Sequence, residues 1–303
     1  MIIDKAGKVT ENFYVIGHSN IPVFLLDGPR PVLFDAGFAS LGSIYVKEIR
    51  KILGNRSPAY LFLTHSHFDH IGAAAYFKKV WPEIRIGGSA RAREILSRPN
   101  AIRLIRELNQ EGGLALRAWG DLSPEERPFE PFDLDFILTP GDMIELGPLS
   151  RIQVIHAPGH TWDFLSFWAL DQKILVASEA VGSANAAGQV FNEFIVDYDA
   201  YLHSQEALSR LDADVLCPGH SVVFTGADVK AHIKRSLKQT VDYLVEVEEI
   251  LREEKGDIDR AAARIKASEW VPKPEPKLPE KPYMINTMAR VKHIWERMQK
   301  NLK

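Results

Sequence analysis

Short apolar runs alternate with helical patterns along the first hundred residues. Runs rich in β-branched and aromatic residues predict strands at residues 13–16, 23–26, 32–34, 60–64 and 84–86. Apolar positions spaced by three or four indicate helices at 71–81 and 90–96. This alternation of strands and helices favours an α/β domain over a helical bundle.

The pattern weakens between residues 97 and 135 and then resumes. This stretch contains a helical piece at 102–108, the pair Gly112-Gly113 and several prolines, so we interpret it as an insertion that forms a lid or pocket wall. An amphipathic helix is predicted at 198–211. Further strands are predicted at residues 152–156, 164–170, 173–177 and 215–217.

The chain changes character after Gly226, where helical patterns dominate. One face of a long helix is indicated by Val229, Ile233, Leu237, Val241, Leu244, Val247 and Leu251. A shorter helix capped by Asp257 should follow, through Ala267. Five prolines in 271–283 predict an extended connector. A last helix carries the apolar stripe Ile285, Met288, Val291, Trp295 and Met298. We therefore divide the chain into a catalytic part, residues 1–225, and a helical extension, residues 226–303, whose stripe suggests a homodimer contact or closure of a pocket.

Composition narrows the class of protein. Of the 303 residues, 46% are hydrophobic and 25% are charged, which is typical of a globular fold, and the formal charge is −3. Such a charge disfavours nucleic-acid and anionic-membrane partners, and no apolar run is long enough for a membrane helix. The N-terminus has no signal-peptide pattern and Cys217 is the single cysteine, so we expect a cytoplasmic protein without an intrachain disulfide.

The densest chemical pattern is Thr64-His65-Ser66-His67-Phe68-Asp69-His70, directly after a predicted strand. Imidazoles at positions i and i+2 of an extended chain share a side, so His65 and His67 can reach one metal ion. Asp69 and His70 lie where the chain turns into the next helix and can bind a second ion. Imidazole combined with carboxylate suits zinc, iron or manganese better than calcium.

Two further histidines follow Pro-Gly pairs at strand ends. His160 lies in His156-Ala157-Pro158-Gly159-His160, and His220 lies in Cys217-Pro218-Gly219-His220. A Pro-Gly turn can aim an imidazole inward, so both are candidate metal ligands. His156 lies within a strand, and we expect it to be packed or to support the site rather than bind metal. Cys217 is interpreted as a buried strand-end residue and not as a nucleophile.

Together, His-x-His-x-Asp-His, two Pro-Gly-His turns and an acid after a strand resemble the metallo-β-lactamase-fold hydrolase superfamily, over residues 12–220. The resemblance implies an α/β fold, the four-layer αββα sandwich, with two divalent metal ions at one edge of its sheets. His65, His67 and His160 would hold the first ion, and Asp69, His70 and His220 the second. Asp35, in Leu33-Phe34-Asp35-Ala36-Gly37, matches a family aspartate that supports the site.

Glu179 departs from the family pattern. Most two-metal members have an aspartate that bridges both ions, whereas here Glu179 is the acid that follows the strand. Its extra methylene adds one C–C bond, about 1.5 Å, to the side chain. Three geometries stay open: Glu179 bridges both ions, binds one of them, or leaves the second site weak.

The expected activity is hydrolysis by a water molecule that two divalent ions, zinc first and iron or manganese as alternatives, make acidic enough to ionise. Asp69 would accept a proton from the water and pass it to the leaving group. The helical extension resembles that of glyoxalase II and of the quinolone-signal thioesterases, which implies a thioester or another small acyl ester as substrate. A lactonase and a metal-binding regulatory protein with little turnover are the alternatives. Aromatic residues in loops expected near the metals suggest an apolar or aryl acyl group: Phe38, Phe68, Trp119, Trp162, Phe191 and Phe194.

Overall fold

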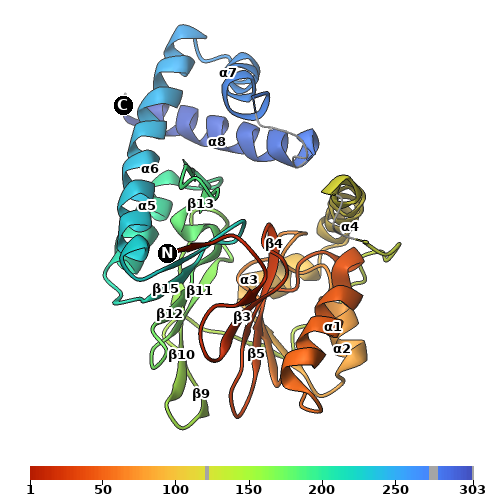
Figure 1. The fold of residues 1–303 in the computed structure, drawn as a ribbon. Helices are drawn as coiled ribbons and strands as arrows, with labels where there is room; N and C mark the ends of the chain where they lie inside the picture. The colour runs from red at the N-terminus through yellow and green to blue at the C-terminus, as the bar shows by residue number, and fades with distance from the viewer. Residues whose placement is uncertain (120–122, 273–278, 302–303) are drawn as a thin grey trace.

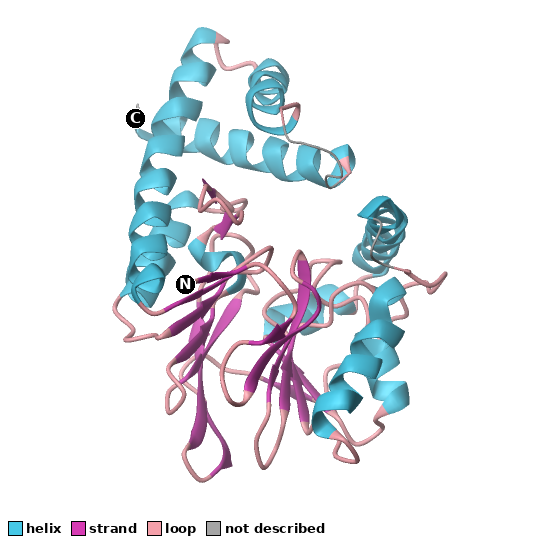
Figure 2. Cartoon of the chain, in the orientation of Figure 1, coloured by secondary structure: helices cyan, strands magenta, loops and turns pink. Residues whose placement is uncertain are grey.

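Two mixed β-sheets lie face to face, with helices on both outer faces and a helical extension above one end (Figure 1). The computed structural model describes residues 1–119, 123–272 and 279–301. Figure 2 shows the two sheets as neighbouring fans of strands with helices outside them. The predicted four-layer αββα sandwich with a C-terminal helical extension is therefore confirmed.

The first sheet comes from the N-terminal half of the chain. Over the described residues it has seven strands in the order β2-β3-β4-β5-β6-β7-β8. Pairing is antiparallel from β2 to β5 and parallel from β5 to β8. The strands are β2 (Gly7–Lys8), β3 (Phe13–His18), β4 (Ile21–Leu26), β5 (Val32–Phe34), β6 (Tyr60–Phe62), β7 (Arg85–Gly88) and β8 (Phe136–Ile137).

The second sheet takes one strand from the N-terminus and the rest from the second half. Its order over the described residues is β1-β16-β15-β12-β11-β10-β9, with β12 and β15 parallel and the other pairs antiparallel. The strands are β1 (Ile2–Ile3), β9 (Met143–Gly147), β10 (Ser150–His156), β11 (Leu165–Ala169), β12 (Ile174–Val176), β15 (Val215–Cys217) and β16 (Val223–Thr225). A small ribbon pairs β13 (Ser183–Ala184) with β14 (Val190–Phe191).

Side chains alternate along each strand between the core that lies between the two sheets and a second core under the outer helices. In β5, Val32 and Phe34 join the core between the sheets, whereas Leu33 packs under the outer helices. The same period of two places Tyr60 and Phe62 inward and Leu61 outward in β6. Strands buried on both faces lack polar alternation, which explains the continuous apolar runs in the sequence.

Helices cover the outer face of each sheet. The first sheet is covered by α1 (Gly42–Leu53), α2 (Ala74–Val80) and α3 (Ala90–Leu96), and the second by α5 (Tyr198–Ser209) and the first turns of α6 (Ala227–Glu253). None of the helices in residues 1–119, 123–272 and 279–301 combines the length and apolar character needed to span a bilayer.

The weakly patterned stretch 97–135 contains more helix than the sequence predicts. In place of a short piece at 102–108, α4 (Pro99–Ala115) continues through Gly112 and Gly113. A Cβ added to Gly112 would lie 2.3 Å from the ring of Phe38. Small residues therefore let α4 pack closely on the turn that follows β5, and this contact outweighs the low helix propensity of glycine.

The extension forms a helical cluster with its own core. Helices α6, α7 (Ile258–Ile265) and α8 (Glu280–Asn301) pack around Val247, Leu251, Ala262, Val291 and Ile294. The predicted cap is present, because the Asp257 side chain accepts a hydrogen bond from the backbone NH of Arg260. The division at residue 225 stays a prediction.

Three details of the predicted extension are wrong. The sequence predicts a connector that reaches residue 283, but α8 begins at Glu280. Pro282 therefore lies in the first helical turn, where its missing NH breaks no helical hydrogen bond. Residues 273–278 of the connector lie outside the described residues. Val241 and Ile285, both assigned to buried stripes, are 45% and 42% exposed. Polar residues take the buried positions in their place: Ser236, Thr240, Thr287 and Arg290.

Candidate metal centre

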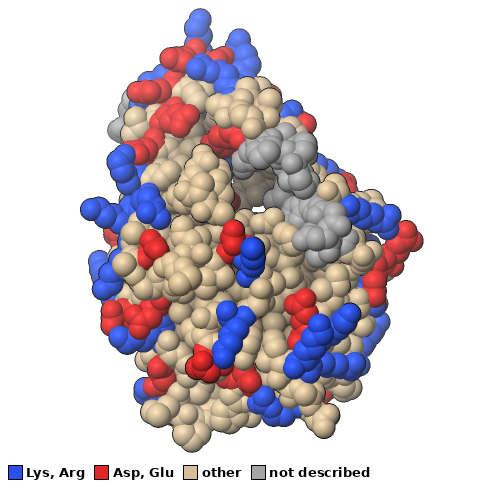
Figure 3. All heavy atoms as spheres, in the orientation of Figure 1, with Lys and Arg blue, Asp and Glu red and all other residues tan. Residues whose placement is uncertain are grey.

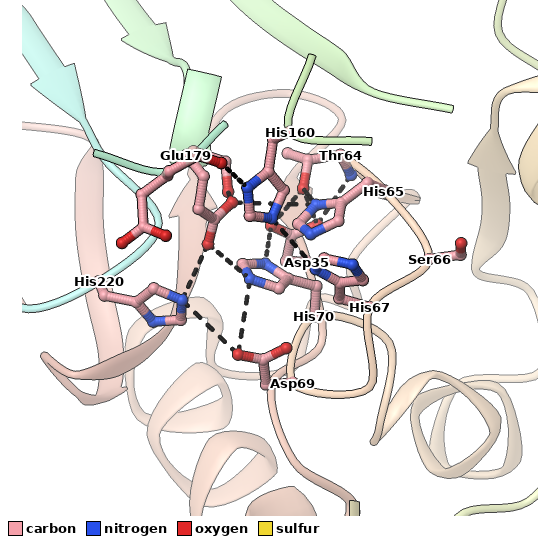
Figure 4. A network of polar contacts seen from close by, with 12 residues as sticks. Asp35, Thr64, His65, Ser66, His67, Asp69, His70, His160, Glu179 and His220 are labelled. Atoms are coloured by element: carbon pink, nitrogen blue, oxygen red, sulfur yellow. Dashed lines mark hydrogen bonds and ion pairs between the residues drawn. The ribbon is translucent and has the colours of Figure 1, made fainter. Parts of the chain in front are cut away.

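Seven predicted ligands meet at one end of the sandwich (Figure 4). They come from loops that follow strands of both sheets. The loop after β6 carries His65, His67, Asp69 and His70, while His160 follows β10, Glu179 follows β12 and His220 follows β15. Strand ends that meet at one edge of a sheet bring their loops together, which is why residues far apart in the sequence converge here.

The donor atoms form three overlapping groups. Within each group, the possible ligand atoms lie within 4.8 Å of one another. The groups are His65, His67 and His160; His65, His70 and Glu179; and Asp69, His70 and His220. The two outer groups match the two ligand sets that the resemblance implies, and the middle group joins them through Glu179.

Glu179 lies between the two outer groups. Its Oε1 is 2.9 Å from Nε2 of His70 and 2.8 Å from Nε2 of His220, and its Oε2 is 3.9 Å from Nδ1 of His65. The Ser178 hydroxyl donates to Oε2 at 2.7 Å. A Cβ on Gly219 would lie 2.2 Å from Oε1, so the Pro-Gly-His turn leaves room for the longer acid. In this structure the carboxylate contacts the His70 and His220 side more closely than the His65 side.

Asp35 supports the loop after β6, as predicted. Its Oδ2 lies 2.9 Å from Nδ1 of His70, and its carboxylate accepts hydrogen bonds from the NH and hydroxyl of Thr64 at 2.8–3.0 Å. Asp35 has φ of 59°, a left-handed conformation that aspartate tolerates better than most residues. This carboxylate therefore fixes the His70 ring with Nε2 toward Glu179.

Backbone carbonyls orient two further histidine rings, and the sequence analysis did not predict these contacts. Nδ1 of His160 donates to the carbonyl of Glu193 at 2.5 Å, and Nδ1 of His220 donates to the carbonyl of Asn20 at 2.7 Å. Backbone groups leave no residue signature, so composition could not reveal these contacts. Asp163 was also missed: it accepts from the NH of Ser66 at 2.8 Å, and its place three residues after His160 was an available signal.

Burial and charge set the protonation of the histidines. Burial lowers the pKa of His65, of His67 and of His160, the last to about 3, so these rings are neutral. Burial opposes protonation of His70 and His220 too, but neighbouring carboxylates outweigh it and raise both pKa values, that of His220 to about 9. Glu179 contributes most to these shifts, followed by Asp69, and Asp35 adds to the shift of His70. Burial would raise the pKa of Glu179, yet these two rings hold it well below its usual range.

The residues present fit divalent metal ions. Nε2 of His65 is buried and has no hydrogen-bond partner among the described residues, although a buried polar atom normally has one. Nε2 of His160 lies 3.1 Å from Nδ1 of His67, which directs two neutral nitrogens at one place. Buried imidazole nitrogens with carboxylate oxygens are the donor set of zinc, iron and manganese.

The aromatic residues expected near the metals, together with His156 and Cys217, differ in their burial. Phe38 and Phe194 are fully buried in separate cores, whereas Phe68 and Phe191 are half-buried and Trp162 is 43% exposed. The side chain of Trp119 lies outside the described part of the chain. His156 was expected to be packed or to support the site rather than bind metal. It is not packed, because this last residue of β10 is exposed, and it belongs to none of the three donor groups. Cys217 is buried between the sheets, and burial raises its pKa, as expected for a packed residue.

Comparison with known proteins agrees with this geometry. A chain of Bacillus subtilis described as probable metallo-hydrolase YflN is 25% identical over 218 residues, covering 67% of this chain and 79% of that protein. The metallo-beta-lactamase family protein TTHA1429 from Thermus thermophilus has a similar fold, with a TM-score of 0.63, 17% identity and coverage of 99% of this chain and 93% of that one.

A second structural relative, the sec-alkylsulfatase Pisa1 from Pseudomonas, has a TM-score of 0.67 at 14% identity and covers 97% of this chain and 50% of that one. The family model described as the metallo-beta-lactamase superfamily matches residues 17–220, well over half of the chain and the whole ligand set. This protein belongs to the metallo-β-lactamase superfamily.

Proposed function

We propose that this protein is a metal-dependent hydrolase of a thioester or another small acyl ester. The observation that carries the proposal is the convergence of seven nitrogen and oxygen donors in three connected groups at one end of the sandwich. His65, His67 and His160 would hold one ion, and Asp69, His70 and His220 a second, with zinc as the expected metal. When bound, such ions supply Lewis-acid activation of water and of the substrate's carbonyl oxygen.

The negative charge of Glu179, placed among buried histidines, favours the binding of divalent metal ions. Five of the seven proposed ligands are histidines, and an imidazole ring offers no negative charge to offset two divalent ions. The Glu179 carboxylate, 2% exposed, places a negative charge in the middle of the site. Because charges interact strongly where water is excluded, this single group contributes a large part of the attraction for metal.

Asp69 is the proposed proton carrier. Its Oδ2 lies 3.6 Å from Nε2 of His220 and 3.9 Å from Nε2 of His70. The side chains of Asp69 and His220 are 10% and 18% exposed, more than those of His70 or Glu179. Asp69 therefore faces the open side of the site, where it can take a proton from water and return it to the leaving group.

Two helices and an exposed aromatic side chain lie near the proposed site. Helix α8 reaches α4, where the Lys281 ammonium lies 2.6 Å from the Glu111 carboxylate. In Figure 1 these two helices stand above the edge of the sheets, and Figure 3 shows a hollow on the same face, where positive and negative side chains are mixed. Trp162, two residues after His160, offers an exposed aromatic surface suited to an apolar acyl group.

A substrate panel tests the proposal. Purified protein loaded with Zn²⁺ is assayed against acyl thioesters, lactones, and aryl phosphodiesters, with chelator-treated protein as the control. Turnover that is fastest on thioesters and is lost on chelation supports the proposal. Preference for lactones would favour the lactonase, and absence of turnover on every ester would favour a metal-binding regulatory protein.

We also propose that the chain forms a homodimer through its C-terminal helices. Val241 and Val245 lie one turn apart on α6 and are 45% and 51% exposed, which gives an apolar strip on this helix. Replacing both with Glu should convert a dimer into a monomer in sedimentation experiments. A wild-type protein that sediments as a monomer would contradict the proposal.

A further inference from the structure

The segment that orients His160 is held from the C-terminal extension. The carbonyl of Glu193, which accepts from Nδ1 of His160, belongs to the loop between β14 and α5. A histidine that binds metal through one ring nitrogen is aligned by the hydrogen bond of the other. The position of this loop therefore decides where Nε2 of His160 points.

Asn192 is fastened at both its backbone and its side chain. Its carbonyl accepts a hydrogen bond from the guanidinium of Arg290 on α8 at 3.2 Å, and its Nδ2 donates to Oγ1 of Thr240 on α6 at 3.0 Å. Its own Oδ1 accepts from the NH of Phe194 at 3.0 Å. Two helices of the extension thus hold the residue next to Glu193, and the Asn192 side chain closes the turn around it.

Further hydrogen bonds extend this buried network. Thr240 donates to Oε1 of Gln205 at 2.9 Å, and Nε2 of Gln205 donates to the Ser236 hydroxyl at 2.8 Å. Thr240, Gln205 and Ser236 are each at most 1% exposed. Buried polar groups with satisfied partners fix one arrangement, because any shift leaves a donor or acceptor unpaired.

Burial of the Arg290 guanidinium costs desolvation free energy, so its contacts must compensate for this cost. It is 6% exposed, and its guanidinium lies over the Tyr243 ring at 5.3 Å and donates to Oγ1 of Thr287 at 3.2 Å. An apolar side chain would pack α8 without the desolvation penalty of a buried cation. Unlike an apolar side chain, the arginine supplies a donor that reaches the Asn192 carbonyl.

We propose that Arg290 and Thr240 are positioning residues for the metal centre: they fix Asn192, and through it the Glu193 carbonyl that orients the His160 ring. This inference rests on the proposed metal site. It gives the helical extension a part in metal binding although none of the seven proposed ligands lies in it.

Metal affinity tests the proposal independently of turnover. Zn²⁺ affinity is measured by competition with a chromophoric chelator, and Co²⁺-substituted protein is examined by visible absorption, for wild type, Arg290→Met, and Thr240→Val. Partners that orient metal-binding histidines change affinity by about 10–100-fold. For Arg290→Met we expect the affinity for the ion that His160 binds to fall about tenfold. Thr240→Val should lower this affinity as well, and both variants should have an altered Co²⁺ spectrum.

Matched variants separate positioning from packing. Glu269→Gln removes another charged neighbour of Arg290, 3.9 Å away, but leaves the contacts of Asn192 intact, so its metal affinity should equal that of wild type. Arg290→Lys should recover part of the affinity. Thr240→Val is nearly isosteric, so it carries the test even where Arg290→Met fails to fold.

Folded variants with wild-type affinity and spectrum would overturn the inference while leaving the proposed function intact. A wild-type protein that binds no metal would overturn both.

Discussion

Replacing Glu179 by Gln is the sharpest test of the metal centre. The amide keeps the length and shape of the side chain but removes its negative charge. In the structure, Oε1 lies within 2.9 Å of Nε2 of both His70 and His220, whereas Oε2 is 3.9 Å from Nδ1 of His65. The substitution should therefore weaken the ion held with His70 and His220 more than the ion held with His65.

The magnitude follows from the burial of the group. Glu179 is 2% exposed, and removing one partner of a buried charge pair costs about 3–5 kcal/mol. Because about 1.4 kcal/mol corresponds to a tenfold change in an equilibrium constant, the affinity for the second ion should fall at least about a hundredfold. We expect less than about a tenfold change for the first ion, whose three imidazoles remain.

Metal stoichiometry after dialysis is the assay. We expect the Glu179→Gln variant to keep the first ion, lose the second and lose most turnover. Glu179→Asp should keep metal with altered turnover, because the carboxylate is retained on a shorter side chain. Glu206→Gln, an exposed position on α5, is the matched control and should behave as wild type. Full and equal retention of both ions in Glu179→Gln would refute the reasoning.

Three further variants test other parts of the account. His65→Ala combined with His67→Ala should remove at least one metal equivalent and abolish turnover; unchanged metal content would exclude this ligand set. Gly219→Ala should displace the Glu179 carboxylate, because the new Cβ would lie 2.2 Å from Oε1, and so should weaken the second ion without changing any charge; wild-type affinity would show that the turn can relax. Burial lowers the pKa of His232 to about 4, so this ring protonates more readily in the unfolded chain. Its contribution to stability is complete above pH 6.5 and is lost as the pH falls toward 4, by up to about 3 kcal/mol. His232→Leu should lack this part of the pH dependence in denaturant titrations, and equal slopes in both proteins would contradict it.

The catalytic part was predictable because its chemistry lies at strand ends. Apolar runs at 32–34 and 215–217 coincide with β5 and β15, and the helical pattern at 90–96 coincides with α3. Ligands that follow buried strands are easy to recognise. Strand periodicity and Pro-Gly turns are local signals. Both signals can be recognised without knowing which strands pair.

The extension was harder to predict from the sequence because its buried face is partly polar. A pattern that counts only apolar positions selects Val241 and Ile285, yet these two side chains are exposed and the polar Thr240 and Arg290 on the same helices are buried. Their partners, Asn192 and Gln205, lie in other elements, so nothing local to the helix indicates that these polar groups are satisfied. Likewise, α4 continues through two glycines because Phe38 packs against them, a contact that local propensity does not contain.

The two sheets explain why one edge of the sandwich gathers the whole site. Each sheet has a parallel pair in its middle, β5 with β6 and β12 with β15. In both pairs an acid follows the first strand and a histidine follows the second: Asp35 and His65 in one half, Glu179 and His220 in the other. Parallel neighbours end at the same edge, so each half delivers one carboxylate and at least one imidazole there. The two carboxylates have different contacts. Asp35 accepts a hydrogen bond from Thr64 and lies beside Nδ1 of His70, whereas Glu179 reaches between the two donor groups. The same arrangement of two parallel strands, present in both sheets, therefore supplies both the carboxylate that positions His70 and the carboxylate that lies between the two donor groups.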